Sequence, residues 1–340
     1  MDAKPVLLIE PTEFAPSPLL YHGDSSVAGP LALVDESRYL SKPSLAARVL
    51  RGLRQRSGPT EPAGIGALNA AISASVRENR PRAVIVVKGG WVTAATIREI
   101  RKVAGCPIAN YSTDNPFNPV VTTINMERCI GAFDYYFTPR LSTIDRLARM
   151  GQKEVHFVPF GFNPMVHFPA ESNSGGKVTD VMFVGGADAV RVSQIEYLER
   201  ALPDLRIRVY GGYWGRTSKR RLHGGVLDGP GYRLAVAGSR MCLNFGRTAN
   251  EDGHTMKTFE LPAMGACMLA EDTEEHRMFL GGGAETGMFG SLDELVDQIR
   301  TLLSDEAKCE SIRGLQHRIL AIPENTYANR LRQMLTIMGV

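Results

Sequence analysis

The residues best suited to chemistry lie in residues 244–270, which read NFGRTANEDGHTMKTFELPAMGACMLA. Asp252 and Glu260 are carboxylates eight residues apart, and Lys257 lies between them. Carboxylates can accept hydrogen bonds from sugar hydroxyls, and a lysine ammonium beside backbone N–H groups can hold a phosphate. The alternative is an ordinary helix start, where acidic residues are favourable near the N-terminal end.

The pattern around these residues predicts a strand, a polar loop, a helix and a second strand. An apolar run at 241–243 precedes the loop, helical spacing begins near Met256, and the helix ends at Gly265. A loop that leaves the carboxyl end of a strand and enters a helix binds ligands in open α/β sheets. The candidate ligand-binding residues in this stretch are Asn244, Gly253, His254, Thr255, Met256, Lys257, Thr258 and Glu260.

A second phosphate-binding candidate follows the predicted strand 180–184. Gly185 and Gly186 end this strand, and Arg191 lies in the helix after them. Glycine lets the backbone approach a phosphate closely, and an arginine beyond it can neutralise a diphosphate. Arg191 is therefore the first candidate for stabilising a departing diphosphate and Lys257 the second. A surface arginine on a helix is the alternative for Arg191.

The predicted strand 205–210 ends in aromatic and glycine residues that can hold a nucleobase. Tyr210 and Gly211 come at its end, and Trp214 follows three residues later. Trp214 can stack on a base or pack the loop. The sequence alone leaves both roles open.

These residues resemble a known class of enzymes. Asp252-Gly253, Glu260 and Gly265 resemble the Glu-x7-Glu motif of nucleotide-sugar glycosyltransferases with the GT-B fold. KTFELPAMGACMLAEDTEEHRMFL resembles the CgeB-type (spore-maturation) glycosyltransferase family, and family-like features run from about residue 84 to the C-terminus. The chain departs from the pattern at Lys257, where the family has Arg, and at Asp252, where the superfamily has Glu. Lysine loses bidentate phosphate geometry, and Asp is one methylene shorter.

The resemblance implies an α/β protein with two Rossmann-like doubly wound domains facing an interdomain cleft. Residues 1–169 would form the acceptor-side domain, residues 170–320 the nucleotide-sugar donor domain, and residues 321–340 a helix packing back on the first domain. It implies a hexosyl- or pentosyltransferase acting on a nucleotide-diphosphate sugar. The spacing from Asp252 to Glu260 implies retention, and the absence of an Asp-x-Asp motif implies that neither metal nor cofactor is needed.

The sequence leaves the acceptor open among saccharide, protein, lipid and nucleic acid. It also leaves the oligomeric state open. Asp114 follows the predicted strand 107–111 within an Asp-Asn-Pro turn that also resembles the family. It would contact the acceptor hydroxyl, or act as the base if the reaction inverts. Lys88, at the end of the predicted strand 81–87, is placed in a cleft wall. Residues 21–24 lie in a long loop and are either acceptor residues or plain surface.

Composition limits which other classes of protein the chain can belong to. The 340 residues, of which 44% are hydrophobic, can fill two domains, and a net charge of +3 does not by itself indicate nucleic acid. Five scattered cysteines indicate reduced core thiols rather than disulfides or zinc ligands. We expect no membrane span and a cytoplasmic location. The arginines at 48–56 and the basic run 219–221 are interpreted as solvated.

Two rival functions fit the same fold. A sugar-nucleotide epimerase would bind the donor and use carboxylates as acid and base. A non-catalytic nucleotide-sugar binding protein is allowed by the substitutions at Asp252 and Lys257.

Overall fold

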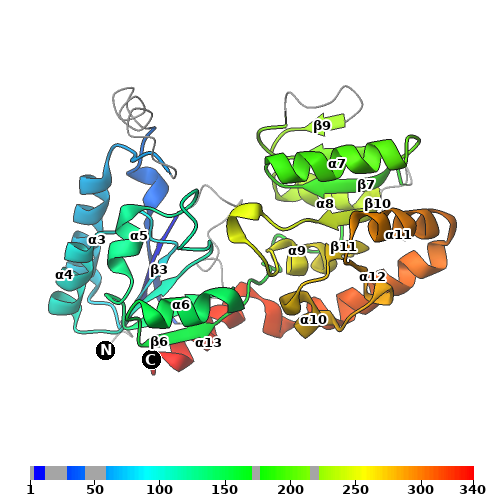
Figure 1. The fold of residues 1–340 in the computed structure, drawn as a ribbon. Coiled ribbons are helices and arrows are strands. Elements are labelled where there is room, and N and C mark those ends of the chain that lie inside the picture. Colours follow the sequence, from blue (N-terminus) through cyan, green and yellow to red (C-terminus); the bar gives the residue numbers. More distant parts are fainter. Residues whose placement is uncertain (1–3, 12–28, 43–58, 171–176, 215–221) are drawn as a thin grey trace. The chain divides into compact units, whose positions relative to one another are not determined.

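The protein divides into two compact units in the structure, a computed structural model that describes residues 4–11, 29–42, 59–170, 177–214 and 222–340 (Figure 1). Unit 1 comprises Met1–Pro159 and Tyr327–Val340, and unit 2 comprises Phe160–Thr326. The sequence analysis places the boundaries at residues 169 and 320, whereas in the structure residues 160–169 and 321–326 belong to unit 2.

Unit 1 is built on a parallel sheet with the strand order β2-β1-β3-β4-β5-β6. Its strands are β1 (Val6–Glu10), β2 (Leu31–Asp35), β3 (Ala83–Val87), β4 (Ile108–Tyr111), β5 (Tyr135–Thr138) and β6 (Glu154–Phe157). Its described helices are η2 (Glu36–Arg38), α3 (Ile65–Asn79), α4 (Ala94–Ala104), α5 (Ile124–Cys129), η3 (Leu141–Thr143), α6 (Ile144–Arg149) and α13 (Tyr327–Ile337).

The strands of unit 1 are apolar on both faces because each face is covered by helices. Val6 and Leu8 of β1 enter a core with α13, whereas Leu7 and Ile9 enter a second core with α3 and α4. Helices α3 and α4 lie side by side in Figure 1. Continuous apolar strands of this kind are typical of parallel sheets buried between two helical layers. The last helix of the chain therefore completes unit 1.

Unit 2 is a second parallel sheet with the order β12-β11-β10-β7-β8-β9. Its strands are β7 (Thr179–Val184), β8 (Ile207–Tyr210), β9 (Leu222–Gly224), β10 (Ser239–Asn244), β11 (Met268–Glu271) and β12 (Met288–Phe289). Its described helices are α7 (Ala189–Ala201), α8 (Gly229–Ala237), η4 (Thr248–Asn250), α9 (Lys257–Ala263), α10 (Glu274–Leu280), η5 (Ala284–Thr286), α11 (Leu292–Ser304), α12 (Glu306–Leu320) and η6 (Pro323–Asn325).

Both strand orders are those of doubly wound folds. Counted within unit 2, the order is 3-2-1-4-5-6, the Rossmann arrangement, and unit 1 has the flavodoxin-like order 2-1-3-4-5 with one further strand. In each sheet the chain reverses direction across the sheet once, between β7 and β10 in unit 2 and between β1 and β3 in unit 1. Ligands bind at the carboxyl ends of the strands at such topological switch points.

Several described elements have no counterpart in the sequence-based predictions. Among them are β2, β9, β12, α5, α10 and α12. Strands β9 and β12 are only three and two residues long. Such short strands carry too few residues for a period to be recognised. None of the helices within the described residues combines the length and apolar character needed to cross a membrane.

The packing of α13 predicts where a core mutation will act. Leu331 of this helix is fully buried against β1 and β3, so Leu331→Ala should lower the free energy of unfolding by about 2–5 kcal/mol. Hydrogen exchange should quicken in the strands of unit 1 and stay unchanged in β10 and β11. Gln333→Ala, on an exposed position of the same helix, is the control and should change neither quantity. Equal loss of protection in both units would contradict this assignment.

Candidate functional site

The switch point of unit 2 is held together by the side chain of Arg191. Its Nε donates to Gly246 O at 3.0 Å, Nη2 donates to Phe245 O at 3.0 Å, and Nη1 donates to Gly186 O at 3.1 Å. Its backbone N–H donates to Asp188, the N-cap of α7. The guanidinium therefore joins the loop after β7 to the end of β10, and burial lowers its pKa from the ordinary value.

Gly185, one of the two glycines predicted to approach a phosphate, is packed against Gly211 at the end of β8. Gly211 has φ +122°, and a Cβ at this residue would lie 2.4 Å from Gly185 O, so only glycine fits there. Gly185 N–H donates to Tyr210 O at 2.9 Å, which joins the ends of β7 and β8. Gly186 lies on the same loop and contributes its carbonyl to Arg191.

Of the two roles open for Trp214, the structure shows packing of the loop. The indole is 3% exposed, donates from Nε1 to Gly185 O at 2.8 Å, and meets the Phe183 ring edge-on. The neighbouring Tyr213, which the sequence analysis did not select, is 91% exposed and has φ +70°. A bulky residue in the left-handed region is strained, and such residues cluster at binding sites. Among the described residues at this edge, Tyr213 is an aromatic residue exposed to solvent.

The loop after β10 is held in place by a buried contact between His254 and Glu275. His254 is fully buried; its Nδ1 lies 2.5 Å from Glu275 Oε2, and its Nε2 accepts from the Phe160 N–H at 3.0 Å. The His254 N–H donates to the same carboxylate at 2.8 Å. Gly253 has φ +91°, and a Cβ there would lie 2.4 Å from Glu275 Oε2. His254 thus supports the loop from the interior.

A second buried network fixes the start of α9. Asn244 donates to Thr258 Oγ1 at 3.0 Å and accepts from Thr255 Oγ1 at 2.7 Å. Thr258 Oγ1 also lies 2.8 Å from His276 Nε2, whose Nδ1 lies 2.7 Å from Glu271 O. Burial, with the neighbouring His254, lowers the pKa of His276 to about 4, so this histidine is neutral at pH 7.

Several loop amides predicted to bind phosphate already have side-chain acceptors. The Thr255 N–H donates to Thr258 Oγ1 at 3.3 Å, and the Lys257 N–H donates to Thr255 Oγ1 at 3.0 Å. Met256 packs its side chain against the core on this side of the sheet. The hydroxyl groups of the loop therefore serve its own conformation.

Glu260 and Lys257 pair with each other. Lys257 Nζ lies 2.6 Å from Glu260 Oε2, and Tyr232 Oη donates to the same oxygen at 3.5 Å. His167 Nε2 lies 4.0 Å from Glu260 Oε1. Burial alone would raise the pKa of Glu260, but Lys257 and His167 outweigh it, so the pKa is lowered and the side chain is ionised at pH 7. The ammonium also lies over the Tyr232 ring, 5.0 Å from its centroid.

Asp252 lies apart from this buried pair. It lines a cavity of ≈390 Å³ at the carboxyl ends of β10, β11 and β12, together with Gly246, Gly253 and Glu271. Glu271 accepts from the Gly246 N–H at 2.8 Å and from Gln194 Nε2 at 3.0 Å. The structure thus places Asp252 and Gly253 on this cavity, whereas Glu260 is buried against Lys257, Tyr232 and His167.

Arg247 is a candidate that the sequence analysis missed. It follows Gly246 directly at the end of β10, is exposed, and its side chain forms no hydrogen bond or ion pair with the described residues. After burial, its positive charge is among the causes that lower the pKa of Arg191. The signal available in the sequence was its position directly after a Gly at the predicted strand end.

In unit 1 the structure places Asp114 beside Lys88. Asp114 Oδ2 and Lys88 Nζ are 3.0 Å apart, at the carboxyl ends of β4 and β3. Three acidic residues lie at the neighbouring strand ends, namely Glu10, Asp35 and Glu36. Burial raises the pKa of Glu36 to about 8, with Asp35 and Glu10 adding to the rise and Lys88 opposing it. The predictions for residues 21–24, 48–56 and 219–221 concern segments outside the described residues.

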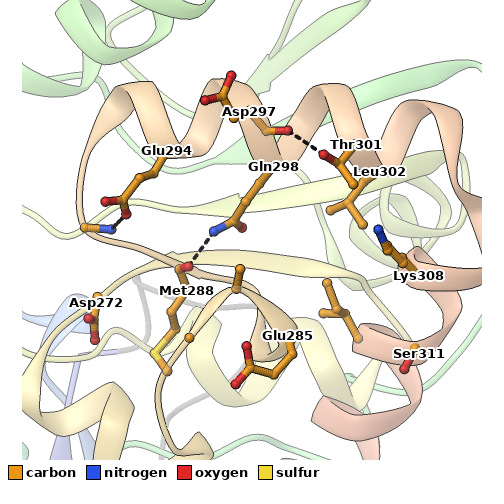
Figure 2. A pocket seen from close by; sticks show the side chains of 14 residues that line it. Asp272, Glu285, Met288, Glu294, Asp297, Gln298, Thr301, Leu302, Lys308 and Ser311 are labelled. Atoms are coloured by element: carbon orange, nitrogen blue, oxygen red, sulfur yellow. Dashed lines mark hydrogen bonds between the residues drawn. The ribbon is translucent and has the colours of Figure 1, made fainter.

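A larger cavity of ≈670 Å³ lies between α11, α12 and the turn before β12. Figure 2 shows Glu285, Gln298, Met288 and Lys308 around it. Its lining includes no residue that the sequence analysis selected. Within the described residues, no group of three or more His, Cys, Asp or Glu side chains is arranged to hold a metal ion.

Comparison with known proteins shows what the second half of the chain resembles. Residues 191–336 match the family model described as Glycosyl transferase-like. A search of curated proteins found no match. The family match supports the predicted glycosyltransferase class.

Solved structures resemble the chain in fold. Anabaena HepE in complex with UDP-glucose has a TM-score of 0.64 at 13% identity, covering 98% of this chain and 99% of HepE. T4 phage BGT in complex with its UDP-glucose substrate has a TM-score of 0.60 at 14% identity, covering 98% and 99%. TarM of S. aureus has a TM-score of 0.58 at 8% identity over 80% of this chain, which spans only 58% of TarM. These likenesses confirm the predicted GT-B fold.

The pKa of Glu36 predicts how stability depends on pH. The pKa of Glu36 in the folded protein, about 8, lies above its ordinary value of 4.5. Protonation of Glu36 therefore stabilises the fold fully below about pH 4.5, and this stabilisation is lost as the pH rises to 8. Glu36→Gln cannot ionise and should therefore be more stable than wild type by about 2–4 kcal/mol at pH 8. Urea unfolding of both proteins between pH 4.5 and 8.5 measures this difference. A difference independent of pH would contradict the assigned titration.

Proposed function

We propose that the protein is a glycosyltransferase that moves a sugar from a nucleotide-diphosphate sugar to an acceptor. The observation that carries this proposal is the rigid switch point of unit 2, where Arg191 joins the ends of β7 and β10 within the matched domain. An open carboxyl edge of this kind, with glycines and exposed cations, suits a diphosphate. We take UDP-glucose as the first donor to test, because HepE and BGT were solved with it.

The roles of the charged residues follow from which of them are already paired. Arg191 donates three N–H groups to backbone carbonyls, and Lys257 is paired with Glu260. We therefore assign binding of the diphosphate to Arg247, with a contribution from Arg191. A fixed cation lowers the barrier by stabilising the charge that develops on the departing diphosphate. Asp252 lines the adjacent cavity and would accept hydrogen bonds from the donor sugar. Tyr213 offers an exposed ring on which a nucleobase can stack.

We further propose that transfer is retaining and needs no metal. The spacing of Asp252 and Glu260 supports retention, in which the acceptor proton passes to the departing phosphate as the new glycosidic bond forms on the same face. Arginine charge at the switch point can replace a metal ion there. The sequence KTFELPAMG supports assignment to the CgeB-type subfamily, and five free thiols support a cytoplasmic location.

The first experiment is a thermal-shift screen of the full chain against UDP-, GDP-, ADP-, CMP- and dTDP-sugars. A donor at 100 times its dissociation constant adds about 2.7 kcal/mol of stability, which is a readable shift. We expect one nucleotide to stand out and its sugar to be transferred in the presence of EDTA with retained configuration. Conversion of the donor sugar without any acceptor would instead indicate an epimerase, and binding without turnover a binding protein.

Replacement of Arg247 should change nucleotide affinity, whereas replacement of Arg191 should change stability. Arg247→Ala removes an exposed charge and should weaken UDP binding by about tenfold or more while leaving the melting temperature unchanged. Arg191→Ala removes the donors to three carbonyls and should lower the free energy of unfolding by about 2–4 kcal/mol. Calorimetric titration and thermal unfolding of both variants measure the two quantities. Unchanged UDP affinity in Arg247→Ala would refute its assignment, and wild-type stability in Arg191→Ala would refute the structural role.

A further inference from the structure

The larger cavity of unit 2 lies apart from the residues assigned to the donor. It has a volume of ≈670 Å³ and lies between α11, α12 and the turn before β12 (Figure 2). Small-molecule sites are concave and measure about 300–1,000 Å³. Asp272 and Gly290 line this cavity and also the ≈390 Å³ cavity beside Asp252, so the two cavities adjoin at the ends of β11 and β12. The larger cavity is thus spacious enough for a small molecule of its own.

Part of the lining is apolar and buried. Met288, Leu302 and Ile312 line the cavity and are each between 3% and 5% exposed. Gln298 stands in the wall and donates from Nε2 to Met288 O at 2.6 Å, which joins α11 to β12 (Figure 2). An apolar group placed against these three side chains would lose contact with water, and this loss favours binding.

The exposed part of the lining is acidic. Its carboxylates come from the residue after β11, the turn before β12 and helix α11, and they belong to Asp272, Glu285, Glu294 and Asp297. Lys308 of α12 also lines the cavity. The lining therefore combines an apolar part with a charged mouth, and the net charge of the mouth decides which molecules it favours.

Ion pairs with neighbours neutralise most of these charges. The pairs are Asp272 with Arg277 at 3.2 Å, Asp297 with Arg300 at 3.1 Å, and Lys308 with Asp305 at 3.6 Å. Glu294 accepts from the neutral Gly290 N–H at 2.7 Å, whereas Glu285 forms no hydrogen bond or ion pair with the described residues. Two negative charges, those of Glu285 and Glu294, thus remain at the mouth.

The backbone beside Glu285 leaves room for its carboxylate. Gly283 also lines the cavity and has φ +103°. A Cβ at this residue would lie 2.6 Å from Glu285 Oε2, so only glycine fits beside the carboxylate. Glu285 is exposed and lies on the turn below Gln298 in Figure 2. Its charge is therefore within reach of a molecule that enters from solvent.

We propose that this cavity binds a small amphiphilic amine. Its ammonium group pairs with Glu285 at the mouth, and its apolar part lies against Met288, Leu302 and Ile312. Hydrogen bonds between an ammonium and a carboxylate are stronger than those of a neutral hydroxyl, and an anion is repelled by the remaining charges. The proposal stands apart from the transferase function, because it concerns binding at a separate part of unit 2.

Methyl NMR of the full chain with isotope-labelled methionine tests the proposal. Met288 lies in the lining, so its methyl signal, assigned with Met288→Leu, reports on an occupant of this cavity. The probes are hexylamine, hexan-1-ol and hexanoate, which share a chain length and differ in charge. We expect hexylamine to shift this signal with a Kd of about 10 mM or tighter, and the other two to bind about tenfold more weakly or worse. Absence of a shift with hexylamine, or equal binding of hexan-1-ol or hexanoate, overturns the proposal.

Two replacements of Glu285 separate charge from folding. Glu285→Gln keeps the size of the side chain and removes its charge, so it should weaken hexylamine binding about tenfold and leave hexan-1-ol within about twofold. Glu285→Lys should reverse the order, with hexanoate binding more tightly than hexylamine. Since Glu285 is exposed, both variants should melt as wild type does.

The matched control is Glu274→Lys, the same change of charge at an exposed position of α10 outside the lining. It should keep the wild-type order of the three probes. Unchanged hexylamine affinity in Glu285→Gln, or continued preference for hexylamine over hexanoate in Glu285→Lys, overturns the proposal. A reversed order in Glu274→Lys as well would show that the net charge of the protein, and not this cavity, selects the amine, and would overturn it too.

Discussion

The site in unit 2 depends on one guanidinium. At the switch point, the connections after β7 and β10 leave toward opposite faces of the sheet, so no ladder of backbone hydrogen bonds joins the two loops. Arg191 makes that connection by donating to carbonyls on both loops. Its charge is partly removed from water, and three carbonyl dipoles compensate for that loss. The planar fork of arginine fits three acceptors in fixed directions, which a lysine cannot do.

Burial distinguishes the residues that support the site from the interior from those that are exposed at its surface. His254 with Glu275, and Asn244 with Thr258, hold the loop after β10 from the interior. A fully hydrogen-bonded buried network is stiff, and a stiff loop keeps its exposed groups in place before a ligand arrives. Thus the buried histidine supports the site from the interior, while its neighbours Asp252 and Arg247 are exposed.

The sequence predicted the fold well because its signals are local. The run at β3 is continuously apolar, so this strand lies within a few residues of the predicted range 81–87. Strand β12 has two residues and carries no period of its own. Its place is set by pairing with β11, which is a tertiary contact. The GT-B fold was implied by the resemblance of residues 244–270 to nucleotide-sugar glycosyltransferases, and the likeness to solved structures bears it out.

The pairing of side chains could not be read from the sequence in the same way. Arg191 and Lys257 were chosen as cations near a glycine-rich turn, and nothing in the spacing shows that one meets three carbonyls and the other meets Glu260. The sequence likewise leaves open whether Trp214 stacks on a base or packs its loop, and the hydrogen bond to Gly185 O shows the packing role. Such partners come from segments more than fifty residues apart, as for Arg191 and Gly246. Only the folded arrangement decides which charges are neutralised internally.

The two switch points differ in the charged groups that their strand ends carry. The edge of unit 2 carries Arg191 and Arg247 together with Asp252 and Glu271, whereas the edge of unit 1 carries Glu10, Asp35 and Glu36 together with Lys88. Burial raises the pKa of Glu36 to about 8, so this carboxyl group is mostly protonated at neutral pH and adds little negative charge to its edge. Both units have doubly wound strand orders, so the difference between the two edges comes from the side chains at the strand ends and not from topology.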